Sequence, residues 1–130
     1  ILITSSNITT NLGDLVNYDI ICKEFAETEN LAGTWKAIMS NTSENARDRI
    51  ILSGELRNTR NTRSGYSCSG EKIADDGGDL WNGNVDSDVD YYENGSRANG
   101  VYLVMTGSNS NGYILNNQHC DDWSSTSQYD

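Results

Sequence analysis

One short stretch of the chain gathers the carboxylates that come nearest to forming a chemical site. Within it, Asp86-x-Asp88-x-Asp90 places three carboxylates at alternate positions. In a loop such a run can converge on one hard cation, because Ca²⁺ prefers oxygen ligands. It is not an EF-hand, since Tyr91 and Arg97 stand where that motif needs Gly and Glu. The alternatives are a calcium site of another kind and a solvated acidic loop. The whole stretch comprises Asp75, Asp76, Asp79, Asp86, Asp88, Asp90 and Glu93.

His119 and Cys120 are the residue types that could form a nucleophile and its base, and His119 is the only histidine. Adjacent residues of an extended segment point to opposite faces, so the two side chains are not expected to meet. One histidine without further ligands also makes a poor zinc site. No activated nucleophile with a base and an oxyanion site can be assembled from this sequence. We therefore expect no catalytic residues and no required cofactor, with Ca²⁺ the one ion to consider.

Aromatic and amide side chains in residues 53–100 are the candidate contacts for a ligand. Tryptophan can stack on a sugar ring, and Trp35 and Trp123 are expected to pack in the core, which leaves Trp81 as the exposed one. The candidate ligand-binding residues are Trp81, Asn82, Asn84, Tyr91 and Tyr92.

The basic residues concentrate in the middle of the chain. They are interpreted as an anion or glycan patch, as a surface that docks on the acidic half of a neighbouring copy, or as a solvated loop. The solvated loop is favoured, because a charge count alone carries little specificity. The residues concerned are Arg47, Arg49, Arg57, Arg60 and Arg63.

Charge and length exclude several classes of protein. The chain has 130 residues, enough for one domain, which we expect to span 1–130. Its net charge is −10, and residues 71–130 carry eleven acidic and two basic side chains. Such a field repels phosphate backbones, so nucleic acid is not an expected partner. No apolar run approaches the ~20 residues that span a bilayer, so direct membrane insertion is not expected either.

Periodicity predicts a few elements that would carry these residues. Tyr18, Ile21, Cys22 and Phe25 recur at helical spacing between Asp14 and Asn30. Residues 34–40 alternate as a half-buried strand does. The remaining predictions are a first strand at 1–5, a short helix or turn at 43–48, mostly loops over 53–100, and a strand buried on both faces at 101–105.

Cysteines and sequons are consistent with an exported protein. Cys22, Cys68 and Cys120 are disulfide candidates; they are widely spaced and form no C-x-x-C pair. An odd number implies a free thiol, an intermolecular bond or a missing partner. The chain opens without a signal peptide, so we interpret it as a processed or excised form. The candidate glycosylation sites are Asn7, Asn41 and Asn94.

Several runs of residues resemble one known family in their order. They are Ile3-Thr4-Ser5, Gly13, Asp19-Ile20-Ile21-Cys22, Leu31-Ala32-Gly33-Thr34-Trp35-Lys36-Ala37, Arg47-Asp48-Arg49-Ile50, Val104-Met105-Thr106-Gly107-Ser108-Asn109-Ser110-Asn111-Gly112 and Cys120-Asp121-Asp122-Trp123-Ser124-Ser125. Together they resemble the endostatin-like, C-type-lectin-like domain of spirochaete surface lipoproteins and other bacterial exported proteins.

The resemblance implies an α+β fold with one or two helices, a mixed or antiparallel sheet and a long loop region. It also implies an extracellular or cell-surface location. It does not imply one ligand, because this fold carries sugar binders, protein binders and structural modules.

The chain departs from the family in two ways. It has no proline, so it lacks the Glu-Pro-Asn or Gln-Pro-Asp triplet of the sugar-binding members. The family usually continues beyond the Trp123 segment with a closing strand and two cysteines, which would pair with Cys22 and Cys120; Cys68 has no counterpart.

Two functions follow from the resemblance. The first is a surface binding or adhesion module that recognises a glycan or a protein through residues 53–100. The alternative is a structural subunit of a surface filament or sheath, in which a neighbouring copy closes the incomplete sheet.

Overall fold

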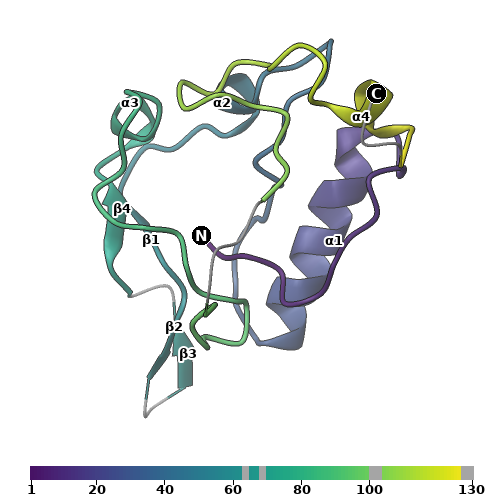
Figure 1. Ribbon diagram of the computed structural model, residues 1–130. Helices are drawn as coiled ribbons and strands as arrows, with labels where there is room; N and C mark the ends of the chain where they lie inside the picture. Colours follow the sequence, from purple (N-terminus) through teal and green to yellow (C-terminus); the bar gives the residue numbers. More distant parts are fainter. Residues whose placement is uncertain (63–64, 68–69, 100–103, 127–130) are drawn as a thin grey trace.

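The longest element is helix α1, Leu15–Thr28, in a computed structural model that describes residues 1–62, 65–67, 70–99 and 104–126 (Figure 1). The Asp14 carboxylate caps α1 by accepting the Val16 backbone N–H. Asn30 ends it in the left-handed conformation at φ 56°, and the Leu31 N–H returns to the Ala26 carbonyl at 2.8 Å. The predicted helix is confirmed.

The other helices are single turns and the strands are short. Helices α2, α3 and α4 span Ala46–Arg49, Gly77–Leu80 and Cys120–Trp123. Strands β1, β2, β3 and β4 span Leu56–Arg57, Arg60–Thr62, Gly65–Ser67 and Lys72–Ala74.

The strands form two antiparallel pairs. β1 pairs with β4, with Leu56 opposite Ala74, and β2 pairs with β3 as a hairpin (Figure 1). The α+β class is confirmed. All four strands and α3 lie within residues 53–100, so the expected loop region contains more regular structure than the sequence predicted.

The strand predicted at 34–40 is wrong, although the predicted alternation is right. Ala37 and Met39 are buried, whereas Thr34 and Lys36 are exposed. Regular pairing is interrupted because the Met39 N–H bonds to the Ala37 carbonyl at 3.0 Å, which closes a three-residue turn.

The strands predicted at 1–5 and 101–105 have separate outcomes. The strand at 1–5 is reduced to one parallel bridge between Ile3 and Tyr92. Of the strand at 101–105, residues 101–103 lie outside the described residues. Val104 and Met105 are 59% and 54% exposed, so the prediction that they are buried is wrong.

Two separate clusters of apolar side chains form the core. The first packs α1 against the C-terminal turn, where Trp123 is fully buried and meets Tyr18 edge to face. The packing role predicted for Trp123 is confirmed, and its indole N–H donates to the Ser40 carbonyl at 2.8 Å. The second cluster, around Ile73, Ala74 and Leu80, lies under β4 and α3.

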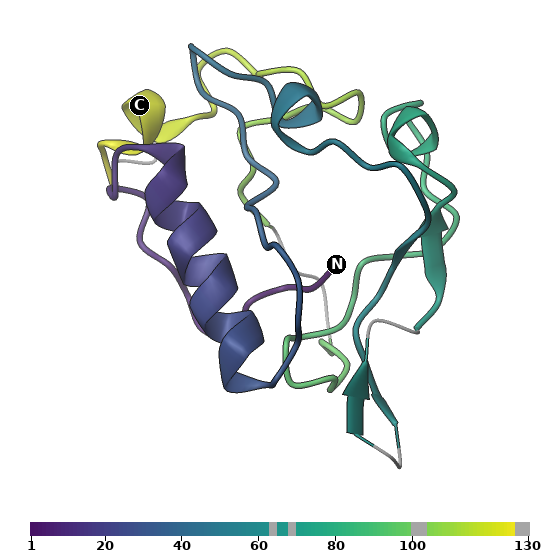
Figure 2. The same ribbon diagram turned by 180° about the vertical axis from the view of Figure 1, so that it is seen from behind.

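The elements that carry the two clusters lie on opposite sides of the molecule (Figures 1 and 2). α1 and α4 form one side and β1, β4 and α3 the other, with the segments 34–40 and 50–56 running between them. Within the described part of the chain, no helix is long and apolar enough to cross a membrane.

Candidate functional site

The segments that connect the two clusters border an open hollow of about 520 Å³. This volume falls within the range of ~300–1,000 Å³ that is usual for ligand sites. Its walls come from the chain's first residue, the segment before Met39 and the run from α2 to β1. The lining residues are Ile1, Ala32, Thr34, Trp35, Lys36, Ile38, Arg49, Ile50, Ile51, Leu52, Glu55, Leu56 and Arg57.

Most of the hollow's walls are apolar. Ile51 is 87% exposed, an unusual position for a large aliphatic side chain, and Ile50 and Leu52 on either side are only half-buried. Trp35 is half-buried on the facing segment, with its indole N–H donated to the Leu31 carbonyl at 3.3 Å. The hollow therefore leaves a cluster of apolar side chains open to solvent, as binding sites do.

The backbone beside these side chains has unused hydrogen-bonding groups. Within the described part of the chain, neither the N–H nor the C=O of Thr34, Trp35, Lys36, Ile38 or Ile51 makes a hydrogen bond. Thr34, Lys36 and Ile51 are exposed, so their backbone groups are accessible to water or to a ligand.

The charged groups at the hollow are basic in excess. Arg49 is buried and pairs with Asp19 at 2.7 Å and with Glu44 at 3.3 Å. Arg57 pairs with Glu55 at 2.8 Å.

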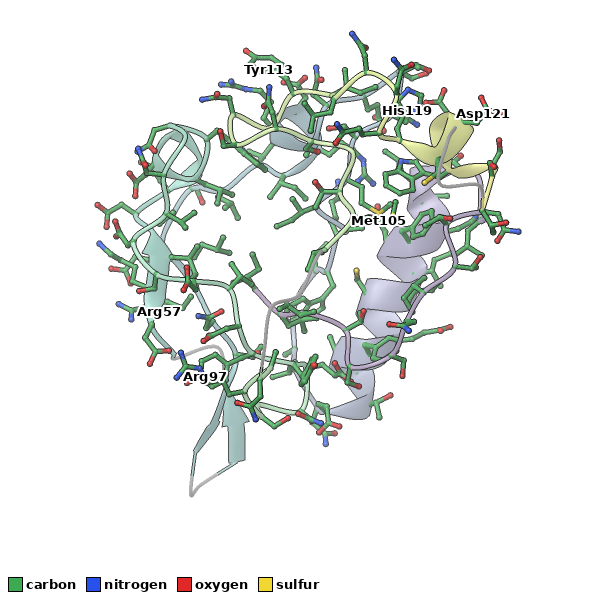
Figure 3. All side chains as sticks on the ribbon, in the orientation of Figure 1. Arg57, Arg97, Met105, Tyr113, His119 and Asp121 are labelled. Carbon is green, nitrogen blue, oxygen red and sulfur yellow. The ribbon has the colours of Figure 1, made fainter. Side chains whose placement is uncertain are left out.

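The alternative of an anion or glycan patch, which the sequence left open beside the favoured solvated loop, does not form from the described side chains. Arg47 lies over the Tyr113 ring, 4.6 Å from its centroid, while Arg49 and Arg57 are held by their own acidic partners. Arg57 and Tyr113 also lie in different parts of the molecule (Figure 3). The side chains of Arg60 and Arg63 lie outside the described residues.

Trp81 is not the exposed tryptophan that the sequence predicted. It is half-buried against the second cluster, and a Cβ built on Gly112 would come within 2.7 Å of its ring. Its Nε1 is buried, with no hydrogen-bond partner among the described residues. Trp81 is covered because the turn around Gly112, far along the sequence, packs over its indole.

The other candidate ligand residues are divided between two turns. Asn82 and Asn84 are exposed, and the Asn82 side-chain oxygen Oδ1 accepts the Asn84 backbone N–H at 2.8 Å. Tyr91 and Tyr92 are half-buried and form backbone bridges with Arg97 and Ile3.

The three carboxylates proposed for calcium do not form one site. Asp86 pairs with Lys72 at 3.1 Å, and Asp90 pairs with Arg97 at 2.6 Å. Asp88 is exposed, and its backbone carbonyl accepts the Asn58 side chain. The structure contains no group of three His, Cys, Asp or Glu side chains that could hold a metal, in the part of the chain it describes. Two of the three carboxylates are thus neutralised by separate basic side chains, Asp86 by Lys72 and Asp90 by Arg97.

Two of the three cysteines are described, and both are thiols. Cys120 is buried in the first cluster and Cys22 packs against it. Burial raises the pKa of Cys22 to about 11, with the nearby Asp19 charge adding to the effect. Cys68, the third disulfide candidate, lies outside the described residues.

His119 acts as a helix cap. Its Nδ1 accepts the Asp122 N–H at 3.0 Å, at the start of α4. All four residues of α4 have φ between 49° and 64°, a left-handed turn that is unfavourable for L-residues. Burial of Trp123 in the first cluster stabilises this turn.

The three candidate glycosylation sites differ in their surroundings. Asn7 is exposed. Asn41 is half-buried and its side-chain oxygen accepts the N–H groups of Ser43 and Glu44. Asn94 is also half-buried, and its side-chain oxygen accepts the N–H and the hydroxyl of Ser96.

Sequence reasoning missed the hollow. The available signal was Ile50-Ile51-Leu52, three consecutive large apolar residues after a basic turn. An irregular segment with one buried face cannot cover all three, so at least one had to be exposed or covered by another element.

In comparisons with known proteins, the chain matches no protein-family model, no curated protein and no solved structure.

Proposed function

We propose that the chain is a binding module whose ligand is an extended segment of another polypeptide, held in the hollow. The observation that carries this proposal is the combination of open apolar walls with unpaired backbone groups. Recognition of an extended peptide can use both: main-chain hydrogen bonds supply affinity, and pockets for side chains supply specificity.

A small apolar molecule would leave more of the backbone hydrogen-bonding groups at the hollow unpaired than a peptide would. Small-molecule sites have apolar walls and a few placed polar groups. Here the unpaired groups belong to Thr34–Lys36 and Ile38 on one segment and to Ile51 on another. A peptide carries a donor and an acceptor on nearly every residue, so it can satisfy such a row.

The scaffold we propose is C-type-lectin-like and extracellular or on a cell surface. The support for it is the ordered series of residues that resemble that family, together with the α+β class. The resemblance does not identify the ligand, because this fold occurs in proteins with many different ligands.

We expect the bound segment to belong to a different protein and not to a neighbouring copy of this chain. Each copy carries a net charge of −10, so copies repel one another at low ionic strength. A surface filament or sheath built from this chain would need that repulsion to be screened or locally offset.

Adhesion through residues 53–100 is the second candidate function. The observation in its favour is the turn at Asn82–Val85, where Asn82 and Asn84 are exposed and Val85 is 48% exposed. A glycan array probed with the wild type and with an Asn82→Ala/Asn84→Ala variant tests it; equal signals from the two proteins would contradict it.

The main proposal is tested with a displayed library of random twelve-residue peptides. Enriched peptides are synthesised and titrated by fluorescence anisotropy against the wild type and two variants. Ile51→Lys should weaken binding at least tenfold, because it places a charge in the apolar wall. Val16→Lys is the matched control: Val16 is 51% exposed on α1 and does not line the hollow, so binding should be unchanged.

Neither variant should unfold the protein, since both positions are exposed and surface substitutions usually change stability little. A library without enriched peptides, or peptides that bind the Ile51→Lys variant as well as the wild type, would contradict the proposal.

A further inference from the structure

Lys36 is the basic side chain at the hollow that has no acidic partner among the described residues. It is exposed and lines the hollow, while Arg49 and Arg57 there are both engaged in ion pairs. An unpaired ammonium at the mouth of an apolar site attracts a negative group on whatever enters.

The charged side chains that line the hollow differ in balance from those of the whole chain. Three basic side chains and one acidic side chain line the hollow, although the net charge of the chain is −10. Arg49 is paired with Asp19 and Glu44, and Arg57 with Glu55. Lys36 is then the charged side chain lining the hollow that has no ion-pair partner among the described residues.

The spacing between Lys36 and Ile38 suggests which positions of a bound peptide should be acidic and apolar. The two residues are two positions apart, and both line the hollow. In an extended peptide, side chains two positions apart also lie on one face. An extended segment that lay against them could place an apolar side chain beside Ile38 and a carboxylate beside Lys36.

We propose that the hollow selects extended polypeptide segments that carry a Glu or Asp two positions from an apolar residue, with Lys36 as the residue that recognises the acid. This inference rests on the proposed function and adds the chemical class of the ligand. Lys36 binds and selects, and the apolar walls retain the segment.

Three synthetic peptides test the inference. The parent is acetyl-Thr-Val-Thr-Glu-Thr-Val-Thr-amide, which has Val, Glu and Val on one face, and the other two have Gln or Lys in place of the Glu. Each is titrated by calorimetry against the wild type, Lys36→Gln and Lys36→Glu. Lys23→Gln is the matched control, because Lys23 is an exposed lysine on α1, outside the hollow.

The wild type and the Lys23→Gln control should prefer the Glu peptide over the Gln peptide by about fivefold, the upper range for a cross-strand charge pair. That preference should disappear in Lys36→Gln. In Lys36→Glu the order should reverse, so that the Lys peptide binds best. A reversal isolates the pairwise interaction, as a double-mutant cycle does.

The outcomes separate this inference from the proposed function. Peptide ratios that do not change when Lys36 is replaced would overturn the charge rule, yet binders from the random library that depend on Ile51 would leave the proposed function standing. Displacement of the Glu peptide by decanoate at an equal concentration would overturn strand pairing, because decanoate has a carboxylate and an apolar chain but no peptide groups. Failure of all three peptides to bind the wild type would overturn the inference.

Discussion

The Arg49 guanidinium donates a 2.7 Å hydrogen bond to the Asp19 carboxylate, and these two side chains together hold both backbone groups of Ala37. The Asp19 Oδ1 accepts the Ala37 N–H at 2.8 Å, and the Arg49 Nη1 donates to the Ala37 carbonyl at 2.9 Å. Side chains from α1 and α2 thus take the place of a neighbouring strand. They fix the segment that forms one wall of the hollow.

Breaking this pair should destabilise the protein. Asp19→Asn removes the negative charge and leaves Arg49, which has a side chain only 6% exposed, without its closest partner. We expect a loss of about 3 kcal/mol in the free energy of unfolding, measured by urea denaturation. Glu27→Gln is the control: it breaks the exposed Lys23–Glu27 pair and should cost less than about 0.5 kcal/mol. Equal losses in the two variants would mean that the buried pair has no special role.

Close packing at Gly112 should make it intolerant of a side chain. Gly112 has φ +77°, and an added Cβ would lie 2.7 Å from both the Arg47 Cβ and the Trp81 ring. Gly13 has nearly the same φ, +74°, with open space around it. Gly13→Ala should therefore cost about 1–2 kcal/mol from backbone strain alone. Gly112→Ala should cost about 1–3 kcal/mol more, because of the added overpacking.

Urea denaturation of both glycine variants provides the measurement. The comparison also tests the packing of the Gly112 turn against Arg47 and Trp81, since these two side chains cause the clash. Equal stabilities of Gly112→Ala and Gly13→Ala would contradict that arrangement.

The Cys22 thiol should react slowly near neutral pH. Its pKa of about 11 is raised by burial, so at pH 8 the thiolate fraction is about a hundredfold below that of an ordinary cysteine. A Cys68→Ser/Cys120→Ala variant makes Cys22 the only thiol, and Ellman's reagent measures its rate. The rate should rise about tenfold per pH unit up to pH 11. Rapid reaction of the folded variant at pH 8 would contradict the burial of this thiol.

The same shift has a consequence for stability. The folded state holds the Cys22 proton more tightly than the unfolded state, so this stabilisation is present below pH 9 and is lost as the pH rises towards 11. Replacing Cys22 with Ala should remove this part of the alkaline loss of stability, as measured by urea denaturation at pH 8 and pH 10.

Asp122 should titrate below its ordinary range. Desolvation acts to raise its pKa, but hydrogen bonds from the Thr42 hydroxyl and N–H, with a contribution from His119, lower it overall. A lowered carboxyl pKa stabilises the folded state above about pH 4, and this contribution is lost as the pH falls further. In Thr42→Ala the hydroxyl is absent, so the pKa of Asp122 should rise, as followed by NMR titration of its carboxyl carbon. Ser43→Ala, one residue away, should leave the pKa unchanged.

The sequence determined the elements whose causes are local. The cap at Asp14, the apolar stripe of α1 and the stop at Asn30 lie within a few residues of the hydrogen bonds they control, so α1 could be predicted nearly to its ends. The alternation of burial from Thr34 to Met39 was equally readable, because it depends only on the two-residue period of an extended chain.

The tertiary structure decided everything that depends on distant partners. Residues 34–40 do not form a strand, because Asp19 and Arg49 bond to Ala37 from 18 and 12 positions away and a turn closes between Ala37 and Met39. Trp81 is covered by a turn that comes some thirty residues later along the chain. The hollow exists because two clusters of apolar residues pack separately and leave the connecting segments between them uncovered. No local pattern encodes such a space, since it is defined by how far apart non-neighbouring segments come to lie.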